Sequence, residues 1–392
     1  MAGHPDPDLA AAGAVVVLGL PEGCAVGLDL LRYAAGPRFR GFAQVPAGVH
    51  LLHAGLGDLR HGEWIELRAG QVAVREWDPA TEELRPGREA AEDVAGRPLD
   101  VASGFGPYDA ARNAPWGRLA GRVSAAVLAR CRANAGVLFP AQEEVSEVPV
   151  RGVETAQPEV PGVEAAPAHD GAAAAEQTTR YTPLHLRRRA GMSPGEVTQY
   201  NLDGAVRLET VLAASFEGDW ELLLGELQAA FLLFLQISCF ASLKQWMHLV
   251  ELLCRADGSV DTRRALYAEF LGTLKAQLGL VDQDFFEDAV CEGSFLGPAL
   301  EHLLGALEGA DDRAPGPDFA PLAAPREALK RLVAERFGFR AADFSCPDEE
   351  DAPNVVAEPA EPGAGAAEPA PKDAAPVGPD VGRMGWMLSP PE

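Results

Sequence analysis

The chain has 392 residues, of which 47% are hydrophobic, so it is long enough for two folded domains and connecting segments. Its 58 acidic and 33 basic residues give a formal net charge of −25. Because contacts with nucleic-acid phosphates depend on lysine and arginine, this charge argues against direct nucleic-acid binding and favours a protein partner.

The N-terminal residues and the cysteines indicate the compartment. The first residues contain no basic stretch followed by an apolar run, so we expect no signal peptide. The six cysteines are scattered without short spacings, at positions 24, 131, 239, 254, 291 and 346. Scattered cysteines in apolar segments are typical of reduced thiols. We therefore expect a protein of the cytoplasm, the nucleus or both.

The first part of the chain predicts a small β domain. Its short apolar runs are separated by glycine and proline turns at intervals of about 8–12 residues, the spacing of a sandwich or barrel. The clearest runs are Ala14–Leu18, Val49–His53, Trp64–Leu67 and Val72–Trp77. Residues 109–131 have a helical pattern and are expected to close this domain, which would span residues 13–140.

Two segments lack the apolar periodicity of a folded domain. Residues 141–180 are rich in proline, glycine, alanine and glutamate, and we expect a disordered acidic linker there. Residues 346–392 have the same character and are expected to form a disordered tail. Within the tail, Asn354, Val355, Val356 and Ala357 form a short strand-forming island between prolines. We expect these four residues to bind a partner by adding a strand to its sheet edge.

Residues 181–345 predict an all-α domain. Seven segments have helical patterns: Val206–Phe216, Glu221–Ile237, Ala241–Arg255, Thr262–Leu278, Gln283–Cys291, Pro298–Leu307 and Arg326–Phe337. The second is apolar on nearly every face, but its uninterrupted apolar run is far shorter than the ~20 residues of a membrane span, so we expect a core helix. Trp246 lies on the apolar stripe of the third and is expected to anchor the core. The predicted fold class is therefore α+β and multidomain.

No segment carries a complete catalytic or cofactor-binding motif. His50 and His53 are three residues apart on a predicted strand, so their side chains should point to opposite faces and share no metal ion. The Gly-x-Gly pairs at residues 55–57 and 104–106 lack the third glycine and the strand–helix context of a dinucleotide loop. The sequence predicts no enzyme, no metal and no cofactor.

Three positions are candidate phosphorylation sites. Thr182, Ser193 and Ser389 each precede a proline and lie in or beside the segments expected to be flexible. A phosphate there would add negative charge, which repels acidic surfaces and pairs with arginine.

Ordered clusters of residues in both predicted domains resemble the AAR-two splicing-factor family. The N-terminal clusters are Gly13–Val17, Pro21–Gly23, Gly27–Asp29, Gly36–Gly41, Pro46–His53 and Gly106–Tyr108. The C-terminal clusters are Leu224–Phe231, Trp246, Leu252–Cys254, Leu274–Gly279 and Asp284–Phe286. The resemblance covers roughly residues 13–110 and 194–358, as in an ortholog of the vertebrate type, and the linker shows no match.

The resemblance implies a non-catalytic assembly chaperone of the U5 small nuclear ribonucleoprotein in pre-mRNA splicing. It implies that the chain binds the RNase H-like and Jab/MPN-like domains of pre-mRNA-processing factor 8, bridges them with the tail strand, and blocks premature binding of the U5 helicase. We also expect a monomer when the protein is free, in both cytoplasm and nucleus. The alternative is a generic α-helical adaptor in cytosolic trafficking or ubiquitin pathways, which co-purification would distinguish.

Overall fold

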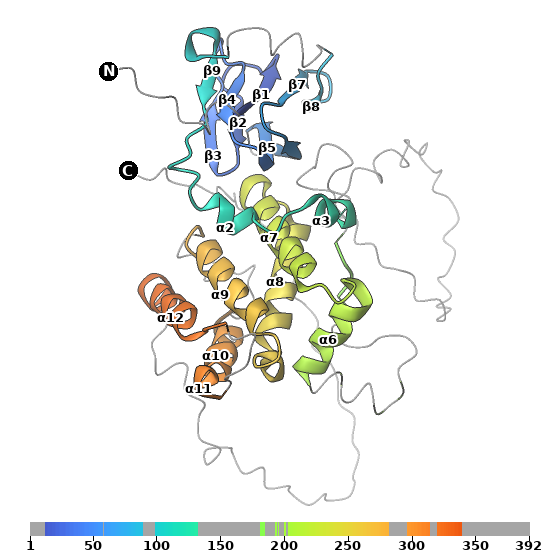
Figure 1. Ribbon diagram of the computed structural model, residues 1–392. Helices are drawn as coiled ribbons and strands as arrows, with labels where there is room; N and C mark the ends of the chain where they lie inside the picture. Colours follow the sequence, from blue (N-terminus) through green and yellow to red (C-terminus); the bar gives the residue numbers. More distant parts are fainter. Residues whose placement is uncertain are drawn as a thin grey trace, which may run out of the picture. The chain divides into compact units, whose positions relative to one another are not determined.

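The structure, a computed structural model, describes residues 12–57, 59–88, 99–131, 181–184, 193, 195, 200, 203–281, 296–313 and 320–338. Strands occupy the first part of the described chain and helices the second, which confirms the predicted α+β fold (Figure 1). The predicted linker, 141–180, and tail, 346–392, lie outside the described residues.

The described strands form two sheets that pack face to face. One has the order β8-β7-β1-β4-β9, with β1 (Gly13–Leu18), β4 (Gly41–Val45), β7 (Val72–Asp78), β8 (Glu83–Pro86) and β9 (Phe105–Pro107). The other has the order β3-β2-β5-β6, with β2 (Ala25–Leu28), β3 (Leu31–Ala34), β5 (Gly48–Leu56) and β6 (Leu59–Leu67). Alternate residues of both sheets, such as Val15, Val17, Leu52 and Ile65, meet in one buried cluster. The predicted sandwich is therefore confirmed.

The helices follow the predicted order. They are α2 (Trp116–Ala120), α3 (Ala125–Arg130), α6 (Gly204–Ser215), α7 (Trp220–Ile237), α8 (Phe240–Cys254), α9 (Arg264–Leu278), α10 (Leu296–Ala306), α11 (Ala310–Arg313) and α12 (Ala323–Phe337). Short 3₁₀ turns, η2 (Val101–Ser103) and η3 (Asp257–Ser259), precede β9 and α9. Six of the seven predicted helices are present, and the segment 283–291 lies outside the described residues.

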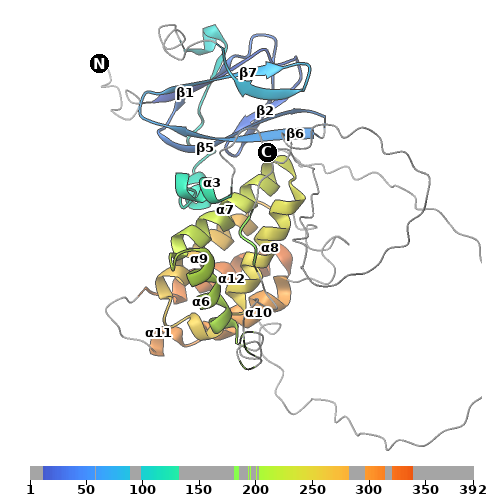
Figure 2. The ribbon, with the colours of Figure 1, turned by 90° about the vertical axis from the view of Figure 1, so that its right-hand side faces the viewer.

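Helix α7 is the core of the helical part, as its composition predicted. Asp219 caps its first turn, and Ser238 ends it with a left-handed φ of 58°. Among the described helices, only α7 is long and apolar enough to cross a membrane, but 72% of it is buried inside the protein. Figure 2 shows α7 beside α8, and the two helices are in contact. This burial is that of a core helix.

The four-stranded sheet and the helices share a hydrophobic cluster. Leu51 and Trp64 of the sheet belong to the same buried cluster as α2, α3 and α7. The indole Nε1 of Trp116 donates to Val49 O at 3.0 Å, and its ring lies 6.2 Å from that of Trp64. Helices α2 and α3 therefore connect the sheet to the helical part rather than only closing the β domain.

Candidate functional site

The predicted site residues fall in different parts of the chain. Thr182 is half-buried against the helices, whereas Ser193 is exposed. Ser389 and the tail island Asn354–Ala357 lie outside the described residues. The structure therefore shows the surroundings of one predicted site, Thr182, in detail. Thr182 belongs to a short segment that is docked on the helices.

The docked segment, Tyr181–Leu184, lies across α7 and α8. The Thr182 N–H donates to Glu226 Oε1 at 2.9 Å, and its hydroxyl donates to Glu226 Oε2 at 2.6 Å. Gln245 Nε2 donates to Thr182 O at 3.0 Å and to Glu226 Oε1 at 2.8 Å. The Tyr181 hydroxyl hydrogen-bonds Ser242 Oγ at 2.6 Å. Backbone and side chain of the segment are thus both fixed by side chains of the core helices.

Glu226 is a buried carboxyl, only 1% exposed, that is held by this segment. Burial raises its pKa above the ordinary value, although the hydrogen bonds from Thr182 and Gln245 and the charge of Arg130 act in the opposite direction. Arg130 also reaches Thr182 Oγ1 at 3.4 Å. A buried acid needs such partners, so the docked segment and Glu226 stabilise each other.

This arrangement bears on the predicted phosphorylation of Thr182. Its hydroxyl hydrogen points to a carboxylate, and a phosphate at the same place would face the Glu226 oxygens at close range. Phosphorylation of Thr182 therefore requires that the segment first leave α7 and α8. Sequence reasoning selected Thr182 from the following proline but missed Glu226 and Gln245. The available signal was the presence of polar residues inside apolar helices, which require partners.

A second polar group lies inside the β sandwich. His50 Nδ1 is 2.7 Å from Asp29 Oδ2 and His50 Nε2 is 2.9 Å from Pro46 O. The Tyr108 hydroxyl donates to Asp29 Oδ2 at 2.6 Å, and the Leu51 N–H donates to Asp29 Oδ1 at 3.0 Å. His50 and His53 lie on opposite faces of β5, as predicted. Among the described residues, no group of three or more metal-binding side chains is present.

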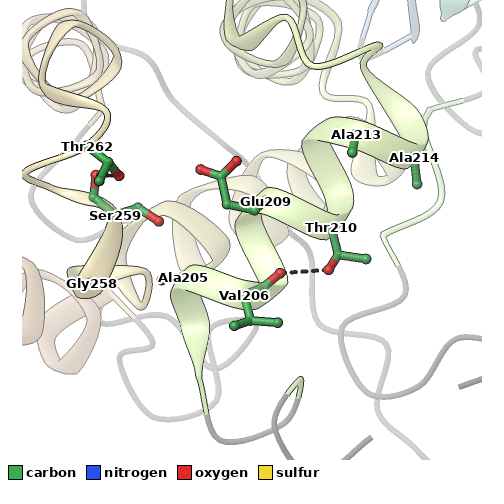
Figure 3. Close-up of a pocket in the computed structure, with 9 residues that line it drawn as sticks. All are labelled: Ala205, Val206, Glu209, Thr210, Ala213, Ala214, Gly258, Ser259 and Thr262. Carbon is green, nitrogen blue, oxygen red and sulfur yellow. Dashed lines mark hydrogen bonds between the residues drawn. The ribbon is translucent and has the colours of Figure 1, made fainter. Parts of the chain in front are cut away.

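An open pocket of about 760 Å³ lies between α6 and η3 (Figure 3). Small side chains form most of its wall, which consists of Ala205, Val206, Glu209, Thr210, Ala213, Ala214, Gly258, Ser259 and Thr262. Its carboxylate, Glu209, accepts two hydrogen bonds from Arg263, at 2.8 and 2.6 Å. The charge of Glu209 is therefore already paired with that of Arg263, the residue just before α9.

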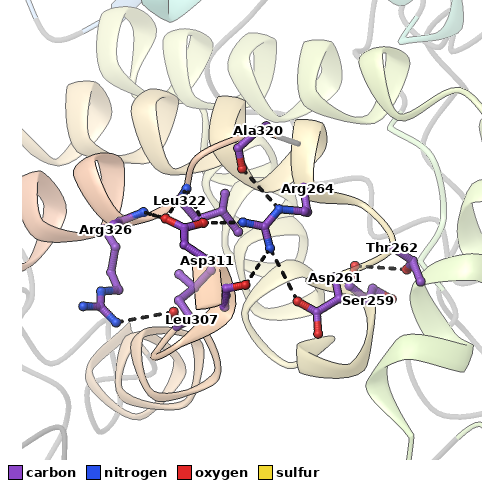
Figure 4. A network of polar contacts seen from close by, with 11 residues as sticks. Ser259, Asp261, Thr262, Arg264, Leu307, Asp311, Ala320, Leu322 and Arg326 are labelled. Atoms are coloured by element: carbon purple, nitrogen blue, oxygen red, sulfur yellow. Dashed lines mark hydrogen bonds and ion pairs between the residues drawn. The ribbon is translucent and has the colours of Figure 1, made fainter. Parts of the chain in front are cut away.

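Arg264 organises a third polar network, where α9, α11 and α12 meet (Figure 4). The guanidinium, 5% exposed, donates to Ala310 O at 3.0 Å and to Ala320 O at 3.2 Å and pairs with Asp311. The Asp311 carboxylate accepts the Ala323 N–H at 2.8 Å at the start of α12. Burial opposes the charge of Asp311, but these donors outweigh it and lower its pKa. The network therefore fixes the backbone that leads into α12.

These sites share one property: their polar groups bind segments of the chain to each other. Within the described residues, the clearest examples are the segment docked on Glu226, the buried pair of His50 and Asp29, and the pair of Arg264 and Asp311 before α12. The fold and sites define a two-part α+β scaffold.

Comparison with known proteins gives the family. Residues 11–133 match the AAR2 N-terminal domain, and residues 181–342 match the AAR2 C-terminal repeat region. The chain is 29% identical over 380 residues to the Protein AAR2 homolog of Mus musculus, covering 90% of this chain and 96% of that protein. It is 28% identical to the Homo sapiens homolog with the same coverage, and 25% to the Caenorhabditis elegans homolog, covering 85% and 94%. The chain belongs to the AAR2 family.

Proposed function

We propose that the protein is a non-catalytic assembly factor of the U5 small nuclear ribonucleoprotein in pre-mRNA splicing. Family membership supports a general role in that assembly, and the matches to both AAR2 domains are the observation that carries the proposal. The net charge of −25 also favours a protein partner over direct contact with RNA phosphates.

The finer proposal concerns the partner. The chain binds the RNase H-like and Jab/MPN-like domains of pre-mRNA-processing factor 8 and blocks premature binding of the U5 helicase. Asn354–Ala357 adds a strand that bridges the two domains, since two β-branched residues between prolines favour extended backbone. The free protein is a monomer of the cytoplasm and nucleus. Its folded parts, 13–140 and 181–345, are separated by the acidic linker.

Truncation after Pro353 tests the role of the tail. The shortened protein should bind the two domains more weakly while its melting temperature stays that of the full chain, because the tail is outside both folded parts. Replacing Asn354–Ala357 with a Gly/Ser stretch should have the same effect, and replacing Ala374–Val377 in the same way is the matched control. Unchanged affinity after truncation would contradict the role of the tail strand.

Competition tests the proposed exclusion of the helicase. Full-length protein added to pre-mRNA-processing factor 8 should reduce helicase binding in proportion to the occupied fraction. Simultaneous binding of both proteins without loss of affinity would contradict the blocking role and leave the assembly role to be tested by co-purification.

A further inference from the structure

Two arginines face each other across the four-stranded sheet, on the face opposite the sandwich core, which also packs on the helices through Leu51 and Trp64. The register places Arg32, Gly27, His53 and Gly62 in one row across the four strands. Arg60 lies two residues before Gly62 on β6 and so shares this face. Strands β3 and β6 are about 14 Å apart, three strand spacings, so long side chains from both can approach over the glycines between them.

His53 occupies the surface of the sheet between Arg32 and Arg60. It is 1% exposed, and a Cβ added at Gly27 would lie 2.1 Å from His53 Cε1, so only glycine allows this placement. Burial and the charges of Arg32 and Arg60 lower the pKa of His53 to about 3, which keeps the ring neutral. Its Nε2 has no hydrogen-bond partner among the described residues. The sheet surface between Arg32 and Arg60 is therefore polar, but His53 supplies no negative charge to offset the two arginines.

Arg32 carries a charge that the described residues do not neutralise. It is half-buried, and its guanidinium makes no hydrogen bond or ion pair with any described residue. Burial and the repulsion of Arg60 lower the pKa of Arg32 to about 10. Arg60 Nη1 donates a hydrogen bond to Gln236 O, near the end of α7, at 3.4 Å. Two positive charges on one face of a sheet favour a negative charge between them.

Strand β3 adds a second feature of a binding site. In the described part of the chain it pairs only with β2, so its other edge presents unpaired backbone groups. Tyr33 is 37% exposed, and Ala34 is exposed beside it. An extended peptide added to this edge would direct every second side chain to the face that carries Arg32.

We propose that β3 and the arginine pair, Arg32 and Arg60, bind an extended peptide that carries a phosphorylated serine or threonine. A phosphate monoester has a charge of about −1.5 to −2 and three acceptor oxygens, which match two guanidiniums better than a single carboxylate does. The strong negative charge of the whole chain disfavours non-specific binding of anions, so binding here depends on local contacts with the two guanidiniums.

Fluorescence anisotropy with the full-length protein tests this site. The probe is a labelled seven-residue peptide of alternating valine and threonine with a central phosphoserine, and its serine counterpart and inorganic phosphate are the comparisons. The phosphopeptide should bind at least about tenfold more tightly than the serine peptide, as expected for charge-assisted hydrogen bonds. Inorganic phosphate should compete only weakly, because it gains nothing from the strand edge.

Arg32→Gln should abolish the preference for phosphoserine, and Arg38→Gln, an equal loss of charge at an exposed arginine nearby, should not. Because Arg32 has no described partner, Arg32→Gln should not lower the melting temperature. Equal affinity for the two peptides, or an unchanged preference in Arg32→Gln, would overturn the proposal. Inorganic phosphate binding as tightly as the phosphopeptide would overturn it also, since the strand edge would then contribute nothing.

Discussion

The surroundings of His50 inside the sandwich favour its positively charged form, because both of its ring nitrogens face acceptors. Nδ1 lies against the Asp29 carboxylate and Nε2 against Pro46 O, and neither oxygen has a hydrogen to donate, so both nitrogens donate. Burial opposes this charge, but the hydrogen bond and charge of Asp29 and the bond to Pro46 outweigh it, so the pKa of His50 is raised above 6.5. The turn between β2 and β3 is thereby tied to β5.

This raised pKa predicts a stability that declines with pH. The contribution of His50 is complete below the unfolded-state value of about 6.5 and is lost as pH rises through the higher folded-state pKa. Urea unfolding of the wild type and His50→Gln between about pH 5.5 and 8.5 measures the difference in unfolding free energy. The difference should shrink as pH rises, whereas a constant or growing difference would contradict a protonated His50. Other histidines are common to both proteins and cancel.

Access to Thr182 is predicted to depend on Glu226. A proline-directed kinase should label Thr182 in the folded protein much more slowly than the exposed Ser193, because the docked segment holds the Thr182 hydroxyl. Glu226→Gln removes the charge and one acceptor, so labelling of Thr182 should rise while that of Ser193 stays the same. Phosphopeptide quantification by mass spectrometry gives both rates. Equal labelling of the two sites in the wild type would show that the segment is not held in solution.

At the scale of elements, the long apolar helices and the strands with clear apolar runs, such as β1 and β7, were predictable, and the shortest strands were not. The predicted starts of the segments that form α7 and α8, Glu221 and Ala241, are each one residue from the observed ones, since apolar periodicity marks them strongly. The β2–β3 hairpin was missed because each strand has four residues and the turn depends on Asp29 with a φ of 60°. The side chains bonded to Asp29 lie up to 79 residues away, at Tyr108, and no local pattern shows them.

Trp246 anchors α8 as predicted. It is 0% exposed, its ring lies 5.6 Å from Phe231, and its Nε1 donates to Gln277 Oε1 at 2.9 Å. Trp246→Ala should reduce the free energy of unfolding by about 3–5 kcal/mol, through lost burial and a cavity. Phe240→Ala, on the same helix but 37% exposed, is the control and should cost much less. Similar small losses for both in urea unfolding would contradict the core role of Trp246.

At the scale of the molecule, the sequence predicted two folded parts but not how α2 and α3 join them. Gln228 of α7 accepts the Arg122 N–H at 2.7 Å and donates to Arg118 O at 3.0 Å. Gly225 faces Arg122 O, where a Cβ would lie at 2.3 Å. These contacts join residues more than 100 positions apart, and nothing in either segment alone specifies its partner. The partners of Thr182, Glu226 and Gln245, were missed for the same reason.

Limited proteolysis tests the organisation into two parts. Cleavage should occur first within 141–180, since that stretch lacks apolar periodicity. Because the sheet and helices share a buried cluster, the two fragments should elute together in gel filtration after the cut. Gel electrophoresis with mass spectrometry locates the cut, and preferential cleavage within α7 or α8 would contradict this organisation.

Affinity purification of the full-length chain from cells, followed by mass spectrometry, tests the central claim most directly. The proposed assembly role predicts enrichment of pre-mRNA-processing factor 8 with other U5 proteins over a tag-only control, and the enrichment should fall when the chain is truncated after Pro353. Enrichment of trafficking or ubiquitin machinery, with no spliceosomal scaffold protein above control, would contradict the claim and favour the adaptor alternative.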